Sequence, residues 1–248
     1  MKTAIISFCL LILMVGGLNA DQKILLVTGE WSPYTSEKIE GYGFFTEIVS
    51  AIFKDAGLEV EYKFYPWQRC ESLVKSGTAF ATFPYKVTED RKKTYDFSHS
   101  LASSTGRFFY LKKRIKSDIK WESFTDLKPY SIGGTKGYWY EKPFKENGLK
   151  IYYGYNDENG IRNLWLERVD LLATEELVGW SLIKKMFPQE IDKFDTVKKP
   201  LNQDNLSLMI SLSYPNAASI KEKFNVCLER IKGKGVYSKI LKKHNIKQ

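Results

Sequence analysis

A single arginine at the end of an apolar stretch is the residue with the clearest chemical potential in this sequence. Residues 79–83 (AFATF) are typical of a short apolar strand that 84–85 (PY) end, and 88–90 (TED) are typical of a helix start. Arg91 would then lie at the edge of a sheet, where a guanidinium can hold a carboxylate through two parallel hydrogen bonds. The alternative is a solvated helix face shared with the lysines at 92–93.

A second candidate anion site is the glycine-rich segment 133–137 (GGTKG). It lacks the lysine and hydroxyl spacing of a P-loop. It follows an expected strand and precedes an expected helix that opens near Tyr138, so its backbone N–H groups could receive an anion. An ordinary glycine turn is the alternative.

The sequence contains few of the residues and motifs that histidine-based catalysis or a metal site would need. His99 and His244 are the only histidines, and the motifs HExxH, CxxC and GxSxG are absent. A histidine-based triad or an imidazole-rich metal centre is therefore not expected. We predict no catalytic residue, no metal site and no cofactor.

Strand and helix patterns alternate along most of the chain. Expected strands over 23–28, 58–64 and 79–83 alternate with expected helices over 44–56 and 67–75. This βαβαβ order predicts a mostly parallel sheet with helices on its faces.

A second α/β series follows the first. Its expected strands, separated by helical segments, cover 107–111, 130–133, 150–153 and 170–173. A strand over 206–212 and helices over 217–231 and 236–243 would complete one of the two units. No linker rich in Gly, Ser or Pro divides them, so we expect two lobes joined by strands, with ligand at the carboxyl ends of strands.

A cleavable secretory signal peptide is predicted for residues 1–20. Lys2 precedes an apolar run over 4–15, and small residues lead to Ala20. The alternative, a transmembrane anchor, is disfavoured because the run is shorter than the roughly 20 apolar residues that a span needs. Cys9 lies too early for a lipoprotein cysteine. A soluble protein exported to the periplasm is predicted.

Charge and cysteine content set further limits. The 248-residue chain has a net charge of +9, but no nucleic-acid-binding module accompanies it, so we expect a solvated basic surface and no nucleic-acid partner. Cys70 and Cys227 remain after cleavage, and either a single disulfide or two buried thiols is compatible with the sequence.

Several short motifs together resemble the bacterial extracellular solute-binding proteins of family 3, the polar amino-acid class that serves ABC transporters. The order and spacing of these motifs support the resemblance more strongly than any single motif does. They are 29–34 (GEWSPY), 43–44 (GF), 47–48 (EI), 66–69 (PWQR), 88–93 (TEDRKK), 96–98 (DFS), 224–225 (FN) and 235–240 (GVYSKI).

The resemblance implies a type II periplasmic-binding-protein-like fold of class α/β. Two lobes, each a mostly parallel sheet flanked by helices, would be joined by two hinge strands and close on a ligand. Lobe 1 would comprise 21–110 and the return segment 206–248, and lobe 2 would comprise 111–205. Cys70 and Cys227 would then share lobe 1, which favours a disulfide.

The resemblance also implies roles for single residues. Arg91 matches the arginine that holds a ligand's α-carboxylate in such proteins. Trp31 and Trp67 match positions that flank the ligand side chain, with two core tryptophans as the alternative. Glu175 matches the lobe 2 acid that receives an ammonium group; Glu176 could take that role instead, and a plain helix-start acid is the further alternative.

Departures from the family pattern bear on the ligand. Small residues usually precede the arginine, but this chain has 83–86 (FPYK), which brings Tyr85 into the expected site. Hydroxyl residues usually follow the lobe 2 glycine, but Tyr138 and Trp139 stand there. Residues 45–46 (FT) replace a common acid and aliphatic pair. An aromatic-lined cleft predicts a ligand with an apolar, planar or sugar-like surface and one anionic end.

The resemblance therefore implies a monomeric, non-enzymatic protein that captures a small anionic or zwitterionic molecule, with the membrane component of an ABC transporter as partner. Two alternatives share the scaffold. One is an enzyme similar to cyclohexadienyl dehydratases, with Glu175 as general acid. The other is a sensor module that closes on a ligand but delivers it to no transporter.

Overall fold

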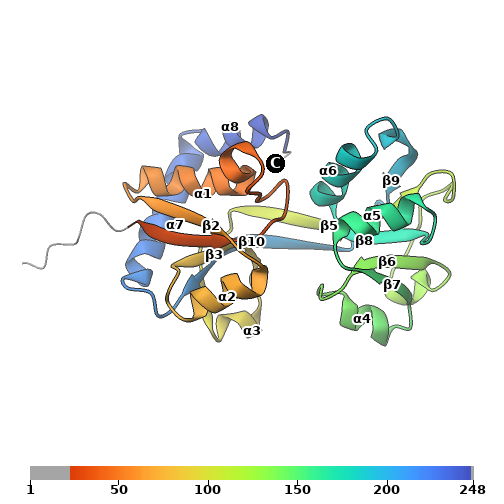
Figure 1. Ribbon diagram of the computed structural model, residues 1–248, viewed down its shortest axis with the longest axis horizontal. Coiled ribbons are helices and arrows are strands. Elements are labelled where there is room, and N and C mark those ends of the chain that lie inside the picture. The colour runs from red at the N-terminus through yellow and green to blue at the C-terminus, as the bar shows by residue number, and fades with distance from the viewer. Residues whose placement is uncertain (1–22, 247–248) are drawn as a thin grey trace, which may run out of the picture.

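The computed structural model describes residues 23–246, so the predicted signal peptide lies outside the described residues. Two α/β lobes lie at opposite ends of the long axis of the molecule (Figure 1). Two long strands run between them, β5 (Ala102–Leu111) and β10 (Asn202–Ser211). The predicted two-lobed α/β architecture is confirmed. The division of the chain at 110 and 205 stays a prediction, because β10 pairs with a strand of lobe 1, β5 pairs with a strand of lobe 2, and the two long strands pair with each other.

Lobe 1 is built from the first βαβαβ series and the C-terminal helices. Its strands are β1 (Ile24–Thr28), β2 (Val60–Phe64), β3 (Ala81–Lys86) and β4 (Tyr95–Phe97). Its helices are η1 (Glu40–Tyr42), α1 (Phe44–Asp55), α2 (Trp67–Lys75), α3 (Glu89–Lys92), α7 (Ala217–Gly233) and α8 (Val236–Lys243).

Lobe 2 is the segment between the two long strands. Its strands are β6 (Ser131–Thr135), β7 (Lys150–Gly154), β8 (Leu171–Glu175) and β9 (Phe194–Thr196). Its helices are η2 (Phe124–Leu127), α4 (Glu141–Glu146), α5 (Asp157–Trp165), α6 (Glu176–Met186) and η3 (Ile191–Lys193). No helix within residues 23–246 is long and apolar enough to cross a membrane.

Eight strands form one hydrogen-bonded series in the order β2-β1-β3-β10-β5-β8-β6-β7, while β4 pairs with β10 and β9 pairs with β5 beside it. Pairing is parallel within each lobe, at β1 with β2 and β3 and at β6 with β7 and β8. It is antiparallel wherever β5 or β10 takes part. The parallel portions therefore point their carboxyl ends toward the space between the lobes, where the fold class places its ligands.

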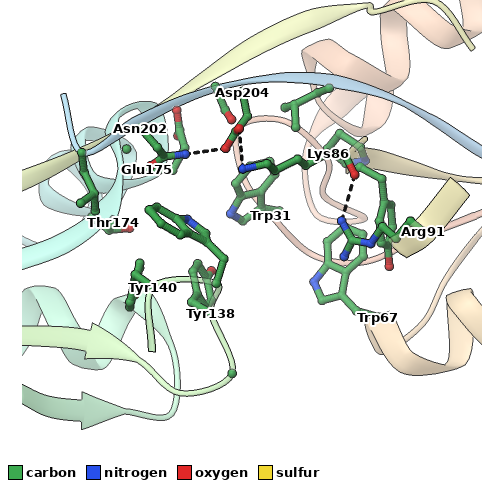
Figure 2. A pocket seen from close by; sticks show the side chains of 18 of the residues that line it. Trp31, Trp67, Lys86, Arg91, Tyr138, Tyr140, Thr174, Glu175, Asn202 and Asp204 are labelled. Atoms are coloured by element: carbon green, nitrogen blue, oxygen red, sulfur yellow. Dashed lines mark hydrogen bonds and ion pairs between the residues drawn. The ribbon is translucent and has the colours of Figure 1, made fainter. Parts of the chain in front are cut away.

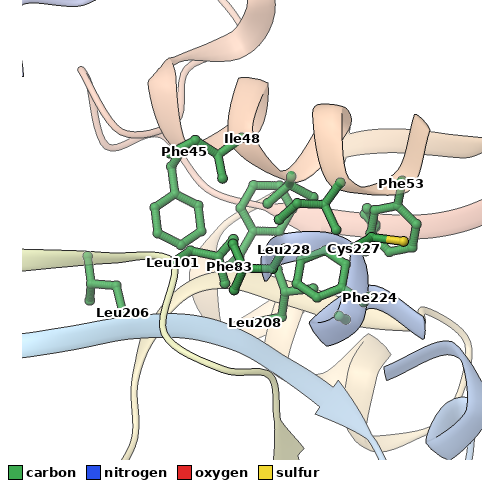
Figure 3. Close-up of a cluster of buried hydrophobic side chains, with 14 of the residues drawn as sticks. Phe45, Ile48, Phe53, Phe83, Leu101, Leu206, Leu208, Phe224, Cys227 and Leu228 are labelled. Carbon is green, nitrogen blue, oxygen red and sulfur yellow. The ribbon is translucent and has the colours of Figure 1, made fainter. Parts of the chain in front are cut away.

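The main core of lobe 1 lies between the sheet and helices α1, α7 and α8 (Figure 3). Phe45 stacks on Phe83 with ring centroids 5.9 Å apart, and Phe53 contacts Phe224 at 5.1 Å. These side chains are almost fully buried, and burial of each large apolar side chain contributes roughly 1.5–3 kcal/mol. The core fixes β3, whose end carries cavity residues.

Cys70 and Cys227 are both buried and both free thiols. Cys227 belongs to the α1/α7/α8 core, whereas Cys70 belongs to a separate cluster under α2. Sharing a lobe did not bring the two sulfur atoms together, so the disulfide alternative is wrong and the thiol alternative is confirmed.

The core of lobe 2 has two clusters, one on each side of β5 and β8. Phe108 belongs to one cluster and the adjacent Phe109 to the other, because successive side chains of a strand point to opposite faces. Helix α6 approaches β5 closely at Gly179, where a Cβ atom would stand 2.4 Å from Cζ of Phe109. Glycine is required there by this contact.

Two predicted element boundaries are wrong in ways that matter for the site. Strand β3 does not end before Pro84 but continues to Lys86, since its last residues pair with β10. The register of that pair shifts between Ser207 and Met209, and an irregular ladder tolerates the missing N–H of proline. The helix expected near Tyr138 begins instead at Glu141.

Candidate functional site

A cavity of about 350 Å³ lies between the lobes (Figure 2). Its wall combines residues of lobe 1, of lobe 2 and of strands β5 and β10. This volume is at the lower end of the range for small-molecule sites. All seven predicted binding residues line this interlobe cavity: Trp31, Trp67, Tyr85, Arg91, Tyr138, Trp139 and Glu175. Their contact with a ligand stays a prediction.

Arg91 reaches the cavity from the short helix α3. The hydroxyl of Thr88 accepts the backbone N–H of Arg91 at 3.2 Å and caps this helix as predicted. Nη1 of Arg91 donates to the carbonyl oxygen of Lys86 at 3.0 Å, and the guanidinium lies 4.8 Å from the centre of the Tyr85 ring. Nη2 lies 3.9 Å from Oε1 of Glu71. The guanidinium has five N–H donors and so keeps some for a ligand carboxylate.

A comparison with the two neighbouring lysines shows that Arg91 is not simply part of a solvated helix face. Lys92 and Lys93 pair with Glu89 and Asp90 on the exposed side of α3. Neither lysine lines the cavity, whereas Arg91 does. The three adjacent cations therefore have different surroundings, and Arg91 alone of the three is available to a molecule in the cavity.

Lys86 is a second cation in the interlobe cavity. Its Nζ forms an ion pair with Oδ1 of Asp204 at 2.6 Å, and Oδ2 of Asp204 accepts from the amide of Asn202 at 2.5 Å. The same Nζ lies 5.5 Å from the ring centre of Trp139 in lobe 2, within range of a cation–π contact. Lys86 thereby contacts both the β10 strand and the far side of the cavity.

Asp204, Asn202 and Glu71 line the cavity without having been singled out in the sequence. For Asn202 and Asp204, the polar run 202–205 directly before the expected apolar strand was the available signal. That signal does not say which of these side chains faces the cavity, because the answer depends on the pairing of β10 with β3 and β5.

Two tryptophans of lobe 1 present ring surface to the cavity. Trp31 stacks on Tyr34 with centroids 4.3 Å apart and planes 18° from parallel. Trp67 meets the Tyr85 ring edge to face at 5.7 Å and lies against Gly29, where a Cβ atom would stand 2.5 Å from the indole. Both tryptophans are only half-buried, so the alternative of two core tryptophans is not what the structure shows.

The aromatic residues of lobe 2 differ in their freedom. The hydroxyl of Tyr138 donates to Oδ2 of Asp157 at 2.8 Å, while Oδ1 of Asp157 accepts from the hydroxyls of Thr135 and Thr174. Burial and then Asp157 raise the pKa of Tyr138. Trp139 is 45% exposed and lines the cavity. Tyr138 is therefore held by a hydrogen bond from its hydroxyl, whereas Trp139 is partly exposed and contacts Lys86 and Tyr140.

Glu175 lines the cavity from the end of β8 and caps helix α6. Its Oε2 accepts the N–H of Val178 at 2.8 Å, and its Oε1 accepts the hydroxyl of Tyr34 at 2.9 Å and the N–H of Thr105 at 3.4 Å. Burial raises the pKa of Glu175 to about 7, although the hydrogen bonds from Val178 and Tyr34 oppose this effect. The carboxyl group is thus both engaged and easily protonated near neutral pH.

Glu176 points to a different partner. Its Oε2 lies 2.7 Å from Nε of Arg107, and Glu176 does not line the cavity. Of the two adjacent acids, Glu175 is the one at the cavity.

Residues 133–135 end strand β6 and residues 136–137 form a turn, so the glycine-rich segment 133–137 is not an anion site. The N–H of Thr135 donates to the Tyr140 hydroxyl, and that of Lys136 donates to the carbonyl of Gly154. The N–H of Gly137 donates to the Glu141 carboxylate. The donors that an anion would need are satisfied within the protein, because the chain makes a further turn before α4 begins.

Three solved structures resemble the whole described fold. The substrate-binding protein of an amino acid ABC transporter is 21% identical, with a TM-score of 0.68 over 90% of this chain and 98% of its own. A histidine kinase sensor domain with similarity to periplasmic binding proteins is 17% identical, with a TM-score of 0.73 over 89% and 95%. The ancestral amino acid-binding protein AncCDT-1, a precursor of cyclohexadienyl dehydratase, is 21% identical, with a TM-score of 0.70 over 89% and 94%.

At these identities the likeness shows the fold alone, and it confirms the type II two-lobed arrangement. No curated protein matches the chain. Family membership comes from the sequence pattern as a whole, which matches the family from residue 24 to residue 247. The chain therefore belongs to the bacterial extracellular solute-binding proteins, family 3.

Proposed function

We propose that this protein captures a small anionic or zwitterionic ligand, an amino acid or a related carboxylate, in the interlobe cavity by lobe closure. The observation that carries the proposal is the Arg91 guanidinium, which lines the cavity with spare donors beside the ring of Tyr85. A ligand that contacts both lobes favours the closed arrangement over an open one.

Transport supplies the biological setting of the proposal. The protein acts as a monomer in the periplasm after cleavage of residues 1–20 and delivers its ligand to the membrane component of an ABC transporter. Support comes from the family and from the similar fold of an amino acid transporter's binding protein. Loss of uptake of the bound compound on deletion of the gene tests this role.

A thermal-shift screen against amino acids, small peptides and carboxylates tests the binding role itself. Arg91→Ala should lower the affinity for any hit by about 10- to 100-fold, because a hydrogen-bonded charge pair contributes roughly 1.5–3 kcal/mol. Lys93→Ala removes an equal charge from the exposed side of the same helix and should leave the affinity unchanged. Equal binding by Arg91→Ala and the unmodified protein would contradict the carboxylate role.

Glu175 favours one second candidate, a dehydratase on the same scaffold. Its pKa of about 7 suits a general acid, and it lines the same cavity as Arg91. Incubation with prephenate or arogenate, followed by detection of the aromatic product, tests this candidate. Absence of turnover removes it.

A sensor role without transport is the third candidate. Its support is the similar fold of a histidine kinase sensor domain. Neighbouring genes for a signalling protein in place of transporter genes would favour it.

A further inference from the structure

An α-amino acid needs two opposite kinds of partner in a binding site. Its carboxylate needs donors such as Arg91, and its ammonium group needs acceptors close by. An ammonium ion is strongly hydrated, so a partly dry cavity takes it up most readily where ionised carboxylates or several oxygen atoms replace the lost water. The acceptors that line the interlobe cavity therefore decide between an amino acid and a plain carboxylate.

Glu175 is a poor acceptor for a ligand. Its side chain receives three hydrogen bonds from the protein, one on Oε2 and two on Oε1, and only 8% of the residue is exposed. Burial also favours the protonated form, which carries no charge to offset that of an ammonium group. Glu175 stands at the position that matches the ammonium-binding acid of the family, but its oxygens are already hydrogen-bonded to other groups of the protein.

Asp204 is engaged as well. One oxygen forms the ion pair with Lys86 and the other accepts from Asn202. Its charge is therefore already balanced within the cavity wall, where the side chain is 15% exposed. An ammonium group could use Asp204 only by displacing the lysine.

Glu71 is the remaining carboxylate in the cavity wall among residues 23–246. It lies 3.9 Å from the guanidinium of Arg91. An ammonium group placed at Glu71 would meet the like charge of Arg91, which costs free energy in a partly buried site. Lys86, a second cation, also lines the cavity. It lies beside Arg91, because the Arg91 side chain donates a hydrogen bond to the backbone carbonyl oxygen of Lys86.

Flat apolar surface accounts for much of the remaining wall. The rings of Trp31, Trp67, Tyr85, Tyr138 and Trp139 all line the cavity, from both lobes. Aromatic rings hold flat apolar groups by stacked or edge-to-face contact. A cavity of about 350 Å³ with this lining suits one ring system and a short acidic arm.

We infer that the ligand is a small carboxylate with a flat apolar body and without an ammonium group beside the carboxylate. This inference rests on the proposed function, since it requires a ligand in the interlobe cavity with its carboxylate on Arg91. It narrows the ligand class from amino acids and related carboxylates to arylalkanoate-like acids.

Matched ligand pairs test the inference. Isothermal titration calorimetry at pH 6.0, on protein freed of bound ligand by unfolding and refolding, compares 3-phenylpropanoate with phenylalanine and indole-3-propanoate with tryptophan. Each pair differs by the ammonium group alone. The acid without that group should bind at least tenfold more tightly, and 3-phenylpropanamide, which lacks the anionic oxygen pair, should bind at least tenfold more weakly than the acid.

Glu71→Gln gives a second test, because the expected change in binding affinity is an increase for a plain carboxylate and a decrease for an amino acid held at Glu71. The substitution removes a negative charge beside Arg91, so the affinity for 3-phenylpropanoate should rise by about threefold, in line with the worth of a partly exposed charge pair. If Glu71 instead held an ammonium group, the same substitution would weaken phenylalanine binding tenfold or more. Lys93→Ala again serves as the control for a distant change of charge.

The outcomes separate the inference from the proposed function. Tighter binding of either amino acid than of its partner acid would overturn the inference and leave the proposed function standing. Binding of an aliphatic amino acid or a sugar acid, when no member of either aromatic pair binds, would also overturn the inference and leave the proposed function standing. If no compound in the whole panel binds, the proposed function falls together with the inference.

Discussion

The hydroxyl of Tyr34 donates a hydrogen bond to Oε1 of Glu175 over 2.9 Å, and this bond joins lobe 1 to lobe 2. Tyr34 is fully buried and supports the ring of Trp31 from behind. Glu175 caps α6 with its other oxygen. Trp31 and Glu175, which both line the cavity, are therefore held in a fixed relation through the buried Tyr34.

Replacement of Tyr34 by phenylalanine should weaken this relation. We expect Tyr34→Phe to lower the free energy of unfolding by about 1–2 kcal/mol, because a buried acceptor loses its best donor. The pKa of Glu175 should rise further, since the Tyr34 hydrogen bond lowers it. Urea denaturation measures the first effect, and NMR titration of labelled glutamate carboxyl carbons measures the second.

Tyr62→Phe is the matched control for Tyr34→Phe. The Tyr62 hydroxyl bonds to Ser50 within lobe 1, away from the cavity. This substitution should leave the Glu175 titration unchanged. An unchanged Glu175 pKa in Tyr34→Phe itself would show that the bond between the lobes does not form in solution.

Glu175 should make stability depend on pH. Burial raises its pKa in the folded protein from 4.5 to about 7, so the folded state holds the proton more tightly than the unfolded state. The free energy of unfolding should therefore fall as pH rises from about 4.5 through 7, by roughly 3 kcal/mol in all at 1.36 kcal/mol per pKa unit.

Glu175→Gln isolates this contribution from those of other titrating groups. Urea denaturation of both proteins between pH 4 and pH 8.5 gives the free energy of unfolding at each pH. The unmodified protein should lose the Glu175 contribution across this window, whereas the variant should lack that component of the pH dependence. A constant difference between the two proteins across the window would contradict the raised pKa.

Gly179 should not tolerate a side chain. A Cβ atom at this position would stand 2.4 Å from Cζ of Phe109, so Gly179→Ala should destabilise the protein by about 1–3 kcal/mol or more through overpacking. Gly233→Ala is the matched control, because Gly233 also lies in a helix but has no atom within 4 Å of the place that a methyl group would take. That control should be neutral or slightly stabilising in urea denaturation.

The two cysteines should behave as buried thiols. Burial raises the pKa of Cys70 to about 11 and raises that of Cys227, so both should react slowly with maleimide in the native protein and quickly after unfolding. Dithiothreitol should leave the thermal midpoint unchanged. A lower midpoint under reducing conditions would indicate a disulfide.

Local sequence was sufficient to predict the structural elements that depend on residues close together in the chain. The alternation of strands and helices, the span of α2 at 67–75 and the Thr88 cap beside Arg91 all follow from periodicity and short-range hydrogen bonding. Boundaries were less predictable: β3 extends through Pro84 because β10, more than a hundred residues later in the chain, pairs with it.

The residue types at the cavity were also readable from the sequence, since each of the seven predicted residues lines it. Only the tertiary structure decided what those residues are free to do. The Lys86–Asp204 ion pair and the Tyr34–Glu175 hydrogen bond join segments that are distant in the chain. Hydrogen bonding and burial depend on such neighbours, so the state of a carboxyl group such as Glu175 emerges only when the lobes are placed together.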